Sequence, residues 1–142
     1  EQAAVQTMVE MWKEAGININ INIQPSAQYW ETWAKVPFGF TPWTHRPLGV
    51  MVLGLAYRSG VPWNESEYDN PEFDRLLTKA EGILDADERR EVVRELETIM
   101  QEDGPIVQPL WRSVFTSMDK RIKGFSMHPT SYLFANEWGI ES

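Results

Sequence analysis

The stretch WNESEYDNPEFDRLLTKAE, residues 63–81, carries the clearest helix signals in this chain. Its Asn70-Pro71 pair is typical of a helix start, because asparagine caps free backbone N–H groups and proline suits the first helical turn. Apolar residues then recur at helical spacing, which predicts an amphipathic helix with one buried face. The residues of that face are Phe73, Leu76, Leu77, Ala80, Ile83 and Leu84.

A second amphipathic helix is predicted directly after the first. Asp85 is a capping residue with Glu88 three positions on, and Gly104-Pro105 ends the helix. Between Glu65 and Asp103 the chain carries 14 acidic and five basic residues, so the outer faces of both helices are expected to be solvated. The apolar face consists of Val92, Val93, Leu96, Ile99 and Met100.

Upstream of these helices, the sequence mixes helix and strand patterns. Residues 1–16 have apolar side chains at helical spacing and end at Gly16. Residues 17–23, INININI, alternate strictly and predict a strand with one buried face. Ser26 is predicted to cap a short helix that Pro37 ends, and a further helix is predicted from Pro47 to Tyr57.

Further strands are predicted at residues 38–43, 106–110 and 114–122. Helices that alternate with strands indicate an α/β fold class. The 142 residues are 42% hydrophobic and 24% charged, which fits one soluble globular domain with a core. Seven Trp, six Phe and four Tyr exceed what such a core usually needs, so some rings are expected to line a surface.

Several function classes are disfavoured by the composition. The net charge of −8, without a basic stripe, argues against nucleic acid as a partner. The longest apolar run, residues 48–57, is too short to cross a bilayer. The chain has no Cys, no G-x-S-x-G and no H-E-x-x-H, and no ligand-spaced carboxylates accompany His45 or His128. We therefore expect a protein that is not an enzyme and that needs no metal, nucleotide or other cofactor.

Three stretches together resemble the C-terminal third of the family-5 extracellular solute-binding proteins. They are residues 63–81, DADERREVVRELETIMQEDGPIVQPLW at residues 85–111, and RIKGFSMHP at residues 121–129. The shared pattern is N-P-x-F-D at a helix start, a second helix that ends in an acidic-Pro turn, and a late K-G. These proteins serve ABC importers for peptides, nickel chelates, opines and some oligosaccharides.

The resemblance implies a class II periplasmic-binding-protein-like fold, of which this chain is a C-terminal fragment. Residues 1–105 are expected to form an α/β lobe, and residues 106–142 a hinge strand and tail that return towards the N-terminal lobe. A peptide or small-molecule ligand is then captured between two lobes and delivered to a membrane permease. The expected location is the periplasm or another extracytoplasmic compartment, with the signal sequence absent from this fragment. An uncovered lobe interface also allows dimerisation or swapping.

The stretch Trp43-Thr44-His45-Arg46 is the most informative candidate for ligand binding. In peptide-binding members of the family, an Asp after the matching Trp pairs with the α-ammonium group of the peptide, and this chain has no carboxylate there. Arg46 instead offers a planar charged fork for a carboxylate or phosphate, and the Trp43 indole can stack on a ligand. The plainer alternatives are a core Trp43, a surface Arg46 and a satisfied polar loop residue at His45. For His45 we favour the plainer alternative.

Tyr57, Arg58, Trp63 and Asn64 flank a predicted long loop and are candidates for one wall of the cleft. Trp63 and Asn64 are equally well explained as an anchor for that loop. Trp111 is a candidate on the hinge strand, where a packed Trp beside an extended arginine is the simpler explanation.

Two ligand hypotheses follow from these residues. Arg46, Arg58 and Arg112 stand beside aromatic residues outside the acidic segment, which suggests an anionic or zwitterionic ligand. The second hypothesis is an aromatic-rich carbohydrate-binding or interaction module that binds by itself. Its stacking platform would consist of Tyr29, Trp30, Trp33 and Trp43.

Overall fold

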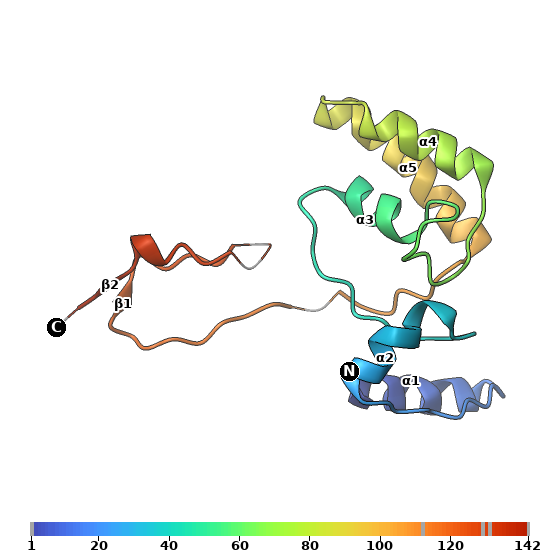
Figure 1. Ribbon diagram of the computed structural model, residues 1–142, viewed down its shortest axis with the longest axis horizontal. Coiled ribbons are helices and arrows are strands. Elements are labelled where there is room, and N and C mark those ends of the chain that lie inside the picture. Colours follow the sequence, from blue (N-terminus) through green and yellow to red (C-terminus); the bar gives the residue numbers. More distant parts are fainter. Residues whose placement is uncertain (1, 112, 129, 131, 142) are drawn as a thin grey trace.

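The computed structural model describes residues 2–111, 113–128, 130 and 132–141. In this part of the chain α-helices dominate, and the sheet has two short strands (Figure 1). The expected α/β class is therefore only partly confirmed: helix and sheet are both present, but the sheet is small. In order, the elements are α1 (Gln2–Glu14), α2 (Ser26–Thr32), the 3-10 helix η1 (Trp33–Lys35), α3 (Gly49–Ala56), α4 (Pro71–Glu81), α5 (Ala86–Asp103), β1 (Ile122–Lys123), the 3-10 helix η2 (Ala135–Glu137) and β2 (Gly139–Ile140).

The two helix starts predicted in the acidic segment are confirmed. The Asn70 side chain accepts hydrogen bonds from the backbone N–H groups of the second and third residues of α4, at 3.0 and 3.1 Å. Asp85 accepts the equivalent pair in α5, at 3.0 and 2.8 Å. Gly104 ends α5 with a φ of 61°, a left-handed conformation that glycine adopts without steric cost.

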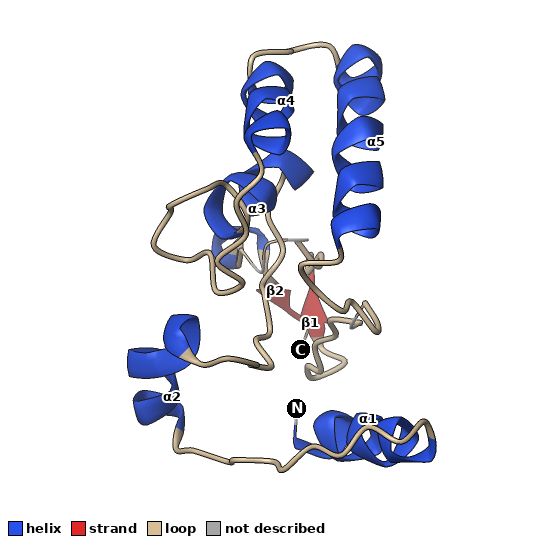
Figure 2. Cartoon of the chain, turned by 90° about the vertical axis from the view of Figure 1, so that its right-hand side faces the viewer, coloured by secondary structure: helices blue, strands red, loops and turns tan. Residues whose placement is uncertain are grey.

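The core lies where α3, α4 and α5 meet. α4 and α5 run side by side, and α3 packs against α4 (Figure 2). The apolar faces predicted for α4 and α5 supply most of the buried side chains. The core residues are Val50, Ala56, Tyr57, Phe73, Leu76, Leu77, Ala80, Val92 and Leu96.

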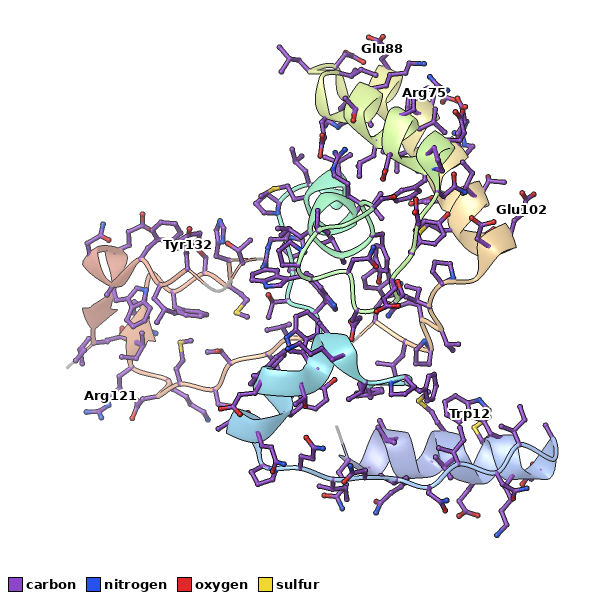
Figure 3. All side chains as sticks on the ribbon, turned by 45° about the vertical axis from the view of Figure 1, so that its right-hand side comes forward. Trp12, Arg75, Glu88, Glu102, Arg121 and Tyr132 are labelled. Atoms are coloured by element: carbon purple, nitrogen blue, oxygen red, sulfur yellow. The ribbon has the colours of Figure 1, made fainter. Side chains whose placement is uncertain are left out.

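The outer faces of α4 and α5 are solvated, as the charge pattern predicts. Arg75, Glu88 and Glu102 point away from α3 and the core (Figure 3). Leu84 is an error in the predicted apolar face, because its side chain is 95% exposed. The helix ends at Glu81, so Leu84 follows the turn and no longer shares the buried face.

The strand predicted at residues 17–23 is wrong for this structure. The segment is extended and runs back along α1, but it forms no ladder with any described strand (Figures 1 and 2). A β-strand needs a neighbour whose backbone pairs with its own N–H and C=O groups. Without one, the side chains of Ile17 and Ile23 are exposed.

Other local predictions differ in the same way. Residues 38–43 and 106–110 form no strand, and of residues 114–122 only Ile122 joins the sheet. Ser26 is the first residue of α2 and not its cap; Pro25 takes the cap position and provides no side-chain hydrogen bond. The helix predicted from Pro47 is present but begins at Gly49.

Residues 106–141, which we call the C-terminal arm, lead away from the helices (Figure 1). Near its end β1 and β2 pair antiparallel, with Ile122 opposite Ile140. Gly124 has a φ of 77°, and a Cβ there would lie 2.2 Å from the carbonyl oxygen of Glu137, so this close approach requires glycine. Large apolar side chains are exposed along the arm, among them Val107, Leu110, Trp111, Val114, Phe115, Tyr132, Leu133 and Ile140.

Candidate functional site

Five aromatic side chains form a continuous row, which we call the tryptophan row. Ring centroids are 5.5 Å apart for Tyr29 and Trp30, 5.6 Å for Trp30 and Trp33, 6.2 Å for Trp33 and Trp43, and 6.1 Å for Trp43 and Trp63. All four pairs meet edge to face, so that the positive edge of one ring meets the negative face of the next. The row brings together α2, η1 and two loops that are distant in sequence.

Exposure along the row is uneven. Trp30 and Trp63 are 49% and 46% exposed, while Trp33 and Trp43 are half-buried. Trp43 also packs against the core. The sequence allows a core position and a ligand-facing position for Trp43. In the structure one part of its side chain lies against the core and another part belongs to an accessible aromatic surface. Ligand contact by Trp43 stays a prediction.

Glu65 lies against Trp43 of the tryptophan row. Its Oε1 accepts a hydrogen bond from Trp43 Nε1 at 3.1 Å, and its Oε2 accepts one from Thr41 Oγ1 at 2.5 Å. Tyr29 Oη lies 2.7 Å from the same threonine hydroxyl. These contacts join α2, the extended stretch before α3 and the loop at residues 59–69 into one half-buried cluster.

Sequence reasoning missed Glu65, Thr41 and the hydroxyl of Tyr29. One signal was available, because Thr41 and Trp43 are two positions apart in an extended stretch and therefore point to the same side. The partner Glu65 comes from an irregular loop, where no periodicity predicts which way a side chain points.

Tyr57 lies in the core, not on an open cleft wall. Burial, and then the negative charge of Glu65, raise the pKa of its phenol to about 12. Arg58 reaches α4, where its guanidinium donates to Thr78 Oγ1 at 3.1 Å and forms an ion pair with Glu81 at 2.7 Å. Both residues join α3 to its neighbours, and their proposed role at a ligand stays a prediction.

Asn64 is buried and holds its loop together. Its Nδ2 donates to the backbone carbonyls of Arg58 at 3.2 Å and Tyr68 at 2.7 Å. Its Oδ1 accepts from the Tyr68 N–H at 3.0 Å and from Ser66 Oγ at 3.0 Å. Both the donor and the acceptor group of the amide thus have partners within the loop. This is the loop-anchoring role that the sequence allows as one of two explanations for Asn64.

The stretch Thr44-His45-Arg46 follows Trp43 of the tryptophan row in the sequence. Thr44 and His45 are exposed, and Arg46 is half-buried. The Arg46 guanidinium donates to Thr44 Oγ1 at 2.7 Å and to the His45 carbonyl at 3.2 Å. It folds onto its own loop, and no described carboxylate forms an ion pair with it.

Trp111 is not among the rings of the tryptophan row. It lies on the C-terminal arm with its side chain 89% exposed, so it is not packed in the way that the simpler explanation required. Arg112, the third arginine considered for an anionic ligand, lies outside the described residues.

Two hollows flank the loop that carries Trp63 and Asn64. One, of about 350 Å³, is bordered by the polar groups of Glu67, Tyr68 and Asp69. The other, of about 260 Å³, is bordered by apolar surface from Leu55, Val61 and Pro62 together with Trp63. The second hollow is therefore continuous with the end of the tryptophan row.

Within the residues that the structure describes, no three His, Cys, Asp or Glu side chains gather as a metal site would require. None of the described helices combines the length and apolar character needed to cross a membrane.

Known proteins similar to this chain are named for the ligands that they bind. The probable D,D-dipeptide-binding periplasmic protein DdpA of Escherichia coli is 31% identical over 72 residues, 51% of this chain and 14% of that protein. Heme-binding protein A of Haemophilus influenzae is 31% identical over 70 residues, 49% of this chain and 13% of that protein. The chain is related to the family-5 periplasmic solute-binding proteins.

Other comparisons define the extent of this relationship. The dipeptide-binding protein of Pseudomonas aeruginosa, another periplasmic solute-binding protein, is 29% identical over 68 residues, 48% of this chain and 13% of that protein. The matched region thus spans 13–14% of the length of these three relatives. No protein-family model matches the chain. No solved structure matches it either.

Proposed function

We propose that the chain is part of the substrate-binding component of an ABC importer, which captures a peptide-like or other small solute and delivers it to a membrane permease. The observation that carries the proposal is the tryptophan row, in which the indoles of Trp30 and Trp63 are half-exposed and Trp63 borders an apolar hollow. Aromatic surfaces with a few placed polar groups are typical of ligand sites. The relationship to periplasmic dipeptide- and heme-binding proteins supports the same role.

The proposed mechanism is capture without chemistry. In a class II binding protein, a ligand that bridges two lobes shifts the equilibrium from open to closed, and the closed form docks on the permease. We propose that residues 1–105 form one lobe and that residues 106–142 form a hinge strand and tail. The extended course of the C-terminal arm, away from the helices, supports this division (Figure 1). The proposed location is the periplasm or another extracytoplasmic compartment.

The ligand-contacting residues proposed from sequence remain Trp43, Thr44, His45, Arg46, Tyr57, Arg58, Trp63, Asn64 and Trp111. Of these, Arg46 makes the sharpest test of an anionic ligand, because its guanidinium has only neutral described partners. If a ligand carboxylate or phosphate pairs with it, Arg46→Ala weakens binding by the intact protein. Equal dissociation constants for the two forms would remove the anionic hypothesis.

A carbohydrate-binding module is the second candidate. The observation in its favour is that the tryptophan row joins the four rings proposed as a stacking platform. This candidate predicts that the 142-residue chain binds oligosaccharides tightly by itself. The importer proposal predicts no tight binding by this chain alone, because closure requires two lobes. A calorimetric titration of the chain with oligosaccharides separates the two.

The decisive experiment for the importer proposal is native mass spectrometry of the intact protein, purified gently from its own host. We expect a bound small molecule that is released by mild denaturation and can be identified by its mass. An intact protein that carries no ligand, and that binds none from a panel of peptides and small solutes, would contradict the proposal.

A further inference from the structure

Among the residues that the structure describes, none places a positive charge on the carboxylate of Glu65. Its two oxygens accept one hydrogen bond each, from an indole N–H and a hydroxyl, both neutral donors. Within the described part of the chain, no Lys, Arg or His forms an ion pair with it; the nearby Arg58 is paired with Glu81. A carboxylate offers about four acceptor positions, so roughly two remain open on Glu65.

The surroundings of Glu65 favour a positive charge. The half-buried carboxylate is partly removed from water, and a charge in that setting is stabilised by an opposite one. Its field reaches Tyr57, because the negative charge of Glu65 contributes to the raised pKa of that phenol. The indoles of Trp43 and Trp63 add the negative faces of their rings, which attract cations.

The neighbouring groups favour an organic cation over a metal ion. An indole N–H and a threonine hydroxyl already occupy one position on each carboxylate oxygen, and no described His or second carboxylate joins Glu65 as a metal ligand. The apolar hollow of about 260 Å³ is bordered by Trp63, whose ring contacts that of Trp43, and it offers room for the hydrocarbon part of such a cation.

We propose that Glu65 and the tryptophan row form a binding site for the charged nitrogen of an organic ammonium ligand, with the hydrocarbon part of that ligand in the hollow beside Trp63. The inference rests on the proposed ligand-binding function and names the chemical class of the ligand. In this site Glu65 holds the Trp43 indole through one oxygen and pairs with the ligand cation through the open positions.

The site is testable by nuclear magnetic resonance on the ¹⁵N-labelled chain at neutral pH, using the indole N–H signals of its tryptophans. The probe is 2-phenylethylammonium, and the matched probes are the neutral 2-phenylethanol and the anionic 3-phenylpropanoate. This chain supplies only one side of the proposed ligand cleft, so we expect weak binding. The probe concentrations in the titrations therefore extend to tens of millimolar. Trp138, which contacts Phe125 in the C-terminal arm, serves as an internal reference.

We expect 2-phenylethylammonium to shift the Trp43 and Trp63 signals saturably, with an affinity about tenfold above that of the alcohol. Glu65→Gln keeps an oxygen acceptor for the indole and removes the charge, so the cation should then bind no better than the alcohol. Glu67→Gln is the matched control, because Glu67 lies in the same loop and its side chain forms no hydrogen bond or ion pair with any described residue. It should leave the preference for the cation unchanged.

Several results would overturn the inference. They are equal affinity for the amine and the alcohol, tighter binding of the carboxylate probe, no shift at Trp43, or an undiminished cation preference in Glu65→Gln. If any of these occurs while the intact protein still releases a bound solute in native mass spectrometry, the cation site fails and the importer proposal stands. If the chain binds the cation selectively but the intact protein binds no solute, the cation site stands and the importer proposal fails.

Discussion

The phenol of Tyr68 donates a 2.5 Å hydrogen bond to the carboxylate of Asp103, 35 residues further along the chain. The same carboxylate oxygen accepts from Asn70 Nδ2 at 2.9 Å, and Asn70 also caps α4. The start of α4 is thereby tied to the last turn of α5. The hydrogen bonds, first from Tyr68 and then from Asn70, hold the pKa of Asp103 below its ordinary value.

This tie makes stability dependent on pH at both extremes. A lowered carboxyl pKa stabilises the fold above the unfolded value of about 3.9, and the contribution is lost as the pH falls through the folded value. Burial, and then the hydrogen bond to Asp103, raise the pKa of Tyr68 to about 12. That contribution is present below the unfolded value of about 10 and is lost as the pH rises towards the folded one.

Tyr68→Phe should therefore lower the free energy of unfolding near neutral pH. The difference from the unchanged chain should become smaller below about pH 4 and above about pH 11. The measurement is urea unfolding followed by circular dichroism across the pH range. Tyr132→Phe, in the exposed part of the C-terminal arm, is the control and should change little. A deficit that is the same at every pH would contradict the role given to this hydrogen bond.

Two leucines in adjacent elements should respond very differently to truncation. Leu77 is fully buried between α4 and its neighbours, so Leu77→Ala should cost about 2–5 kcal/mol of unfolding free energy. Leu84 is almost fully exposed after the end of α4, so Leu84→Ala should change stability by less than about 0.5 kcal/mol. Chemical denaturation of both variants measures the difference. Comparable losses would mean that Leu84 belongs to the core, as its position in the sequence pattern suggested.

Asn64 should be hard to replace. Asn64→Ala leaves the carbonyl and N–H of Tyr68 without a partner and the Arg58 carbonyl with only the 3.4 Å bond from the Val61 N–H, which should cost at least about 2 kcal/mol. Ser66→Ala removes only one of the hydrogen bonds to the same amide and should cost less than about 1 kcal/mol. Thermal unfolding of the two variants provides the test, and similar melting temperatures would contradict it.

Two glycines in the C-terminal arm make a further matched pair. An alanine at Gly124 meets the Glu137 carbonyl and has an unfavourable φ, so Gly124→Ala should open the pairing of β1 and β2. An alanine at Gly139 meets open space and should be tolerated. Hydrogen exchange at the Glu141 N–H, which donates to the Arg121 carbonyl at 3.0 Å, reports the pairing. Equal protection in both variants would show that the close approach at Gly124 is dispensable.

The sequence predicts the part of the fold that depends on local patterns. Asn70, Asp85 and Gly104 mark helix boundaries because capping depends on residues a few positions apart. The buried faces of α4 and α5 follow from helical periodicity, and only the residue beyond the end of α4, Leu84, was assigned wrongly. These features need no knowledge of the rest of the chain.

Strands and the site are less predictable because they depend on partners distant in sequence. Alternation in residues 17–23 favours an extended backbone, but pairing requires a second strand that the described chain does not place beside it. The tryptophan row similarly joins Trp33 to Trp43 and Trp43 to Trp63 across loops. The abundance of aromatic residues predicts that some rings line a surface, whereas their order in the row and the hydrogen bond from Trp43 to Glu65 depend on the tertiary structure.

The short turn between α4 and α5 has a kinetic consequence. Because only residues 82–85 separate the two helices, closing this hairpin costs little chain entropy. Proteins dominated by local contacts fold in microseconds to milliseconds. We expect α4 and α5 to assemble first and to provide the nucleus on which α3 then docks, so that truncations within this hairpin slow refolding, whereas changes in the C-terminal arm leave the refolding rate unaltered.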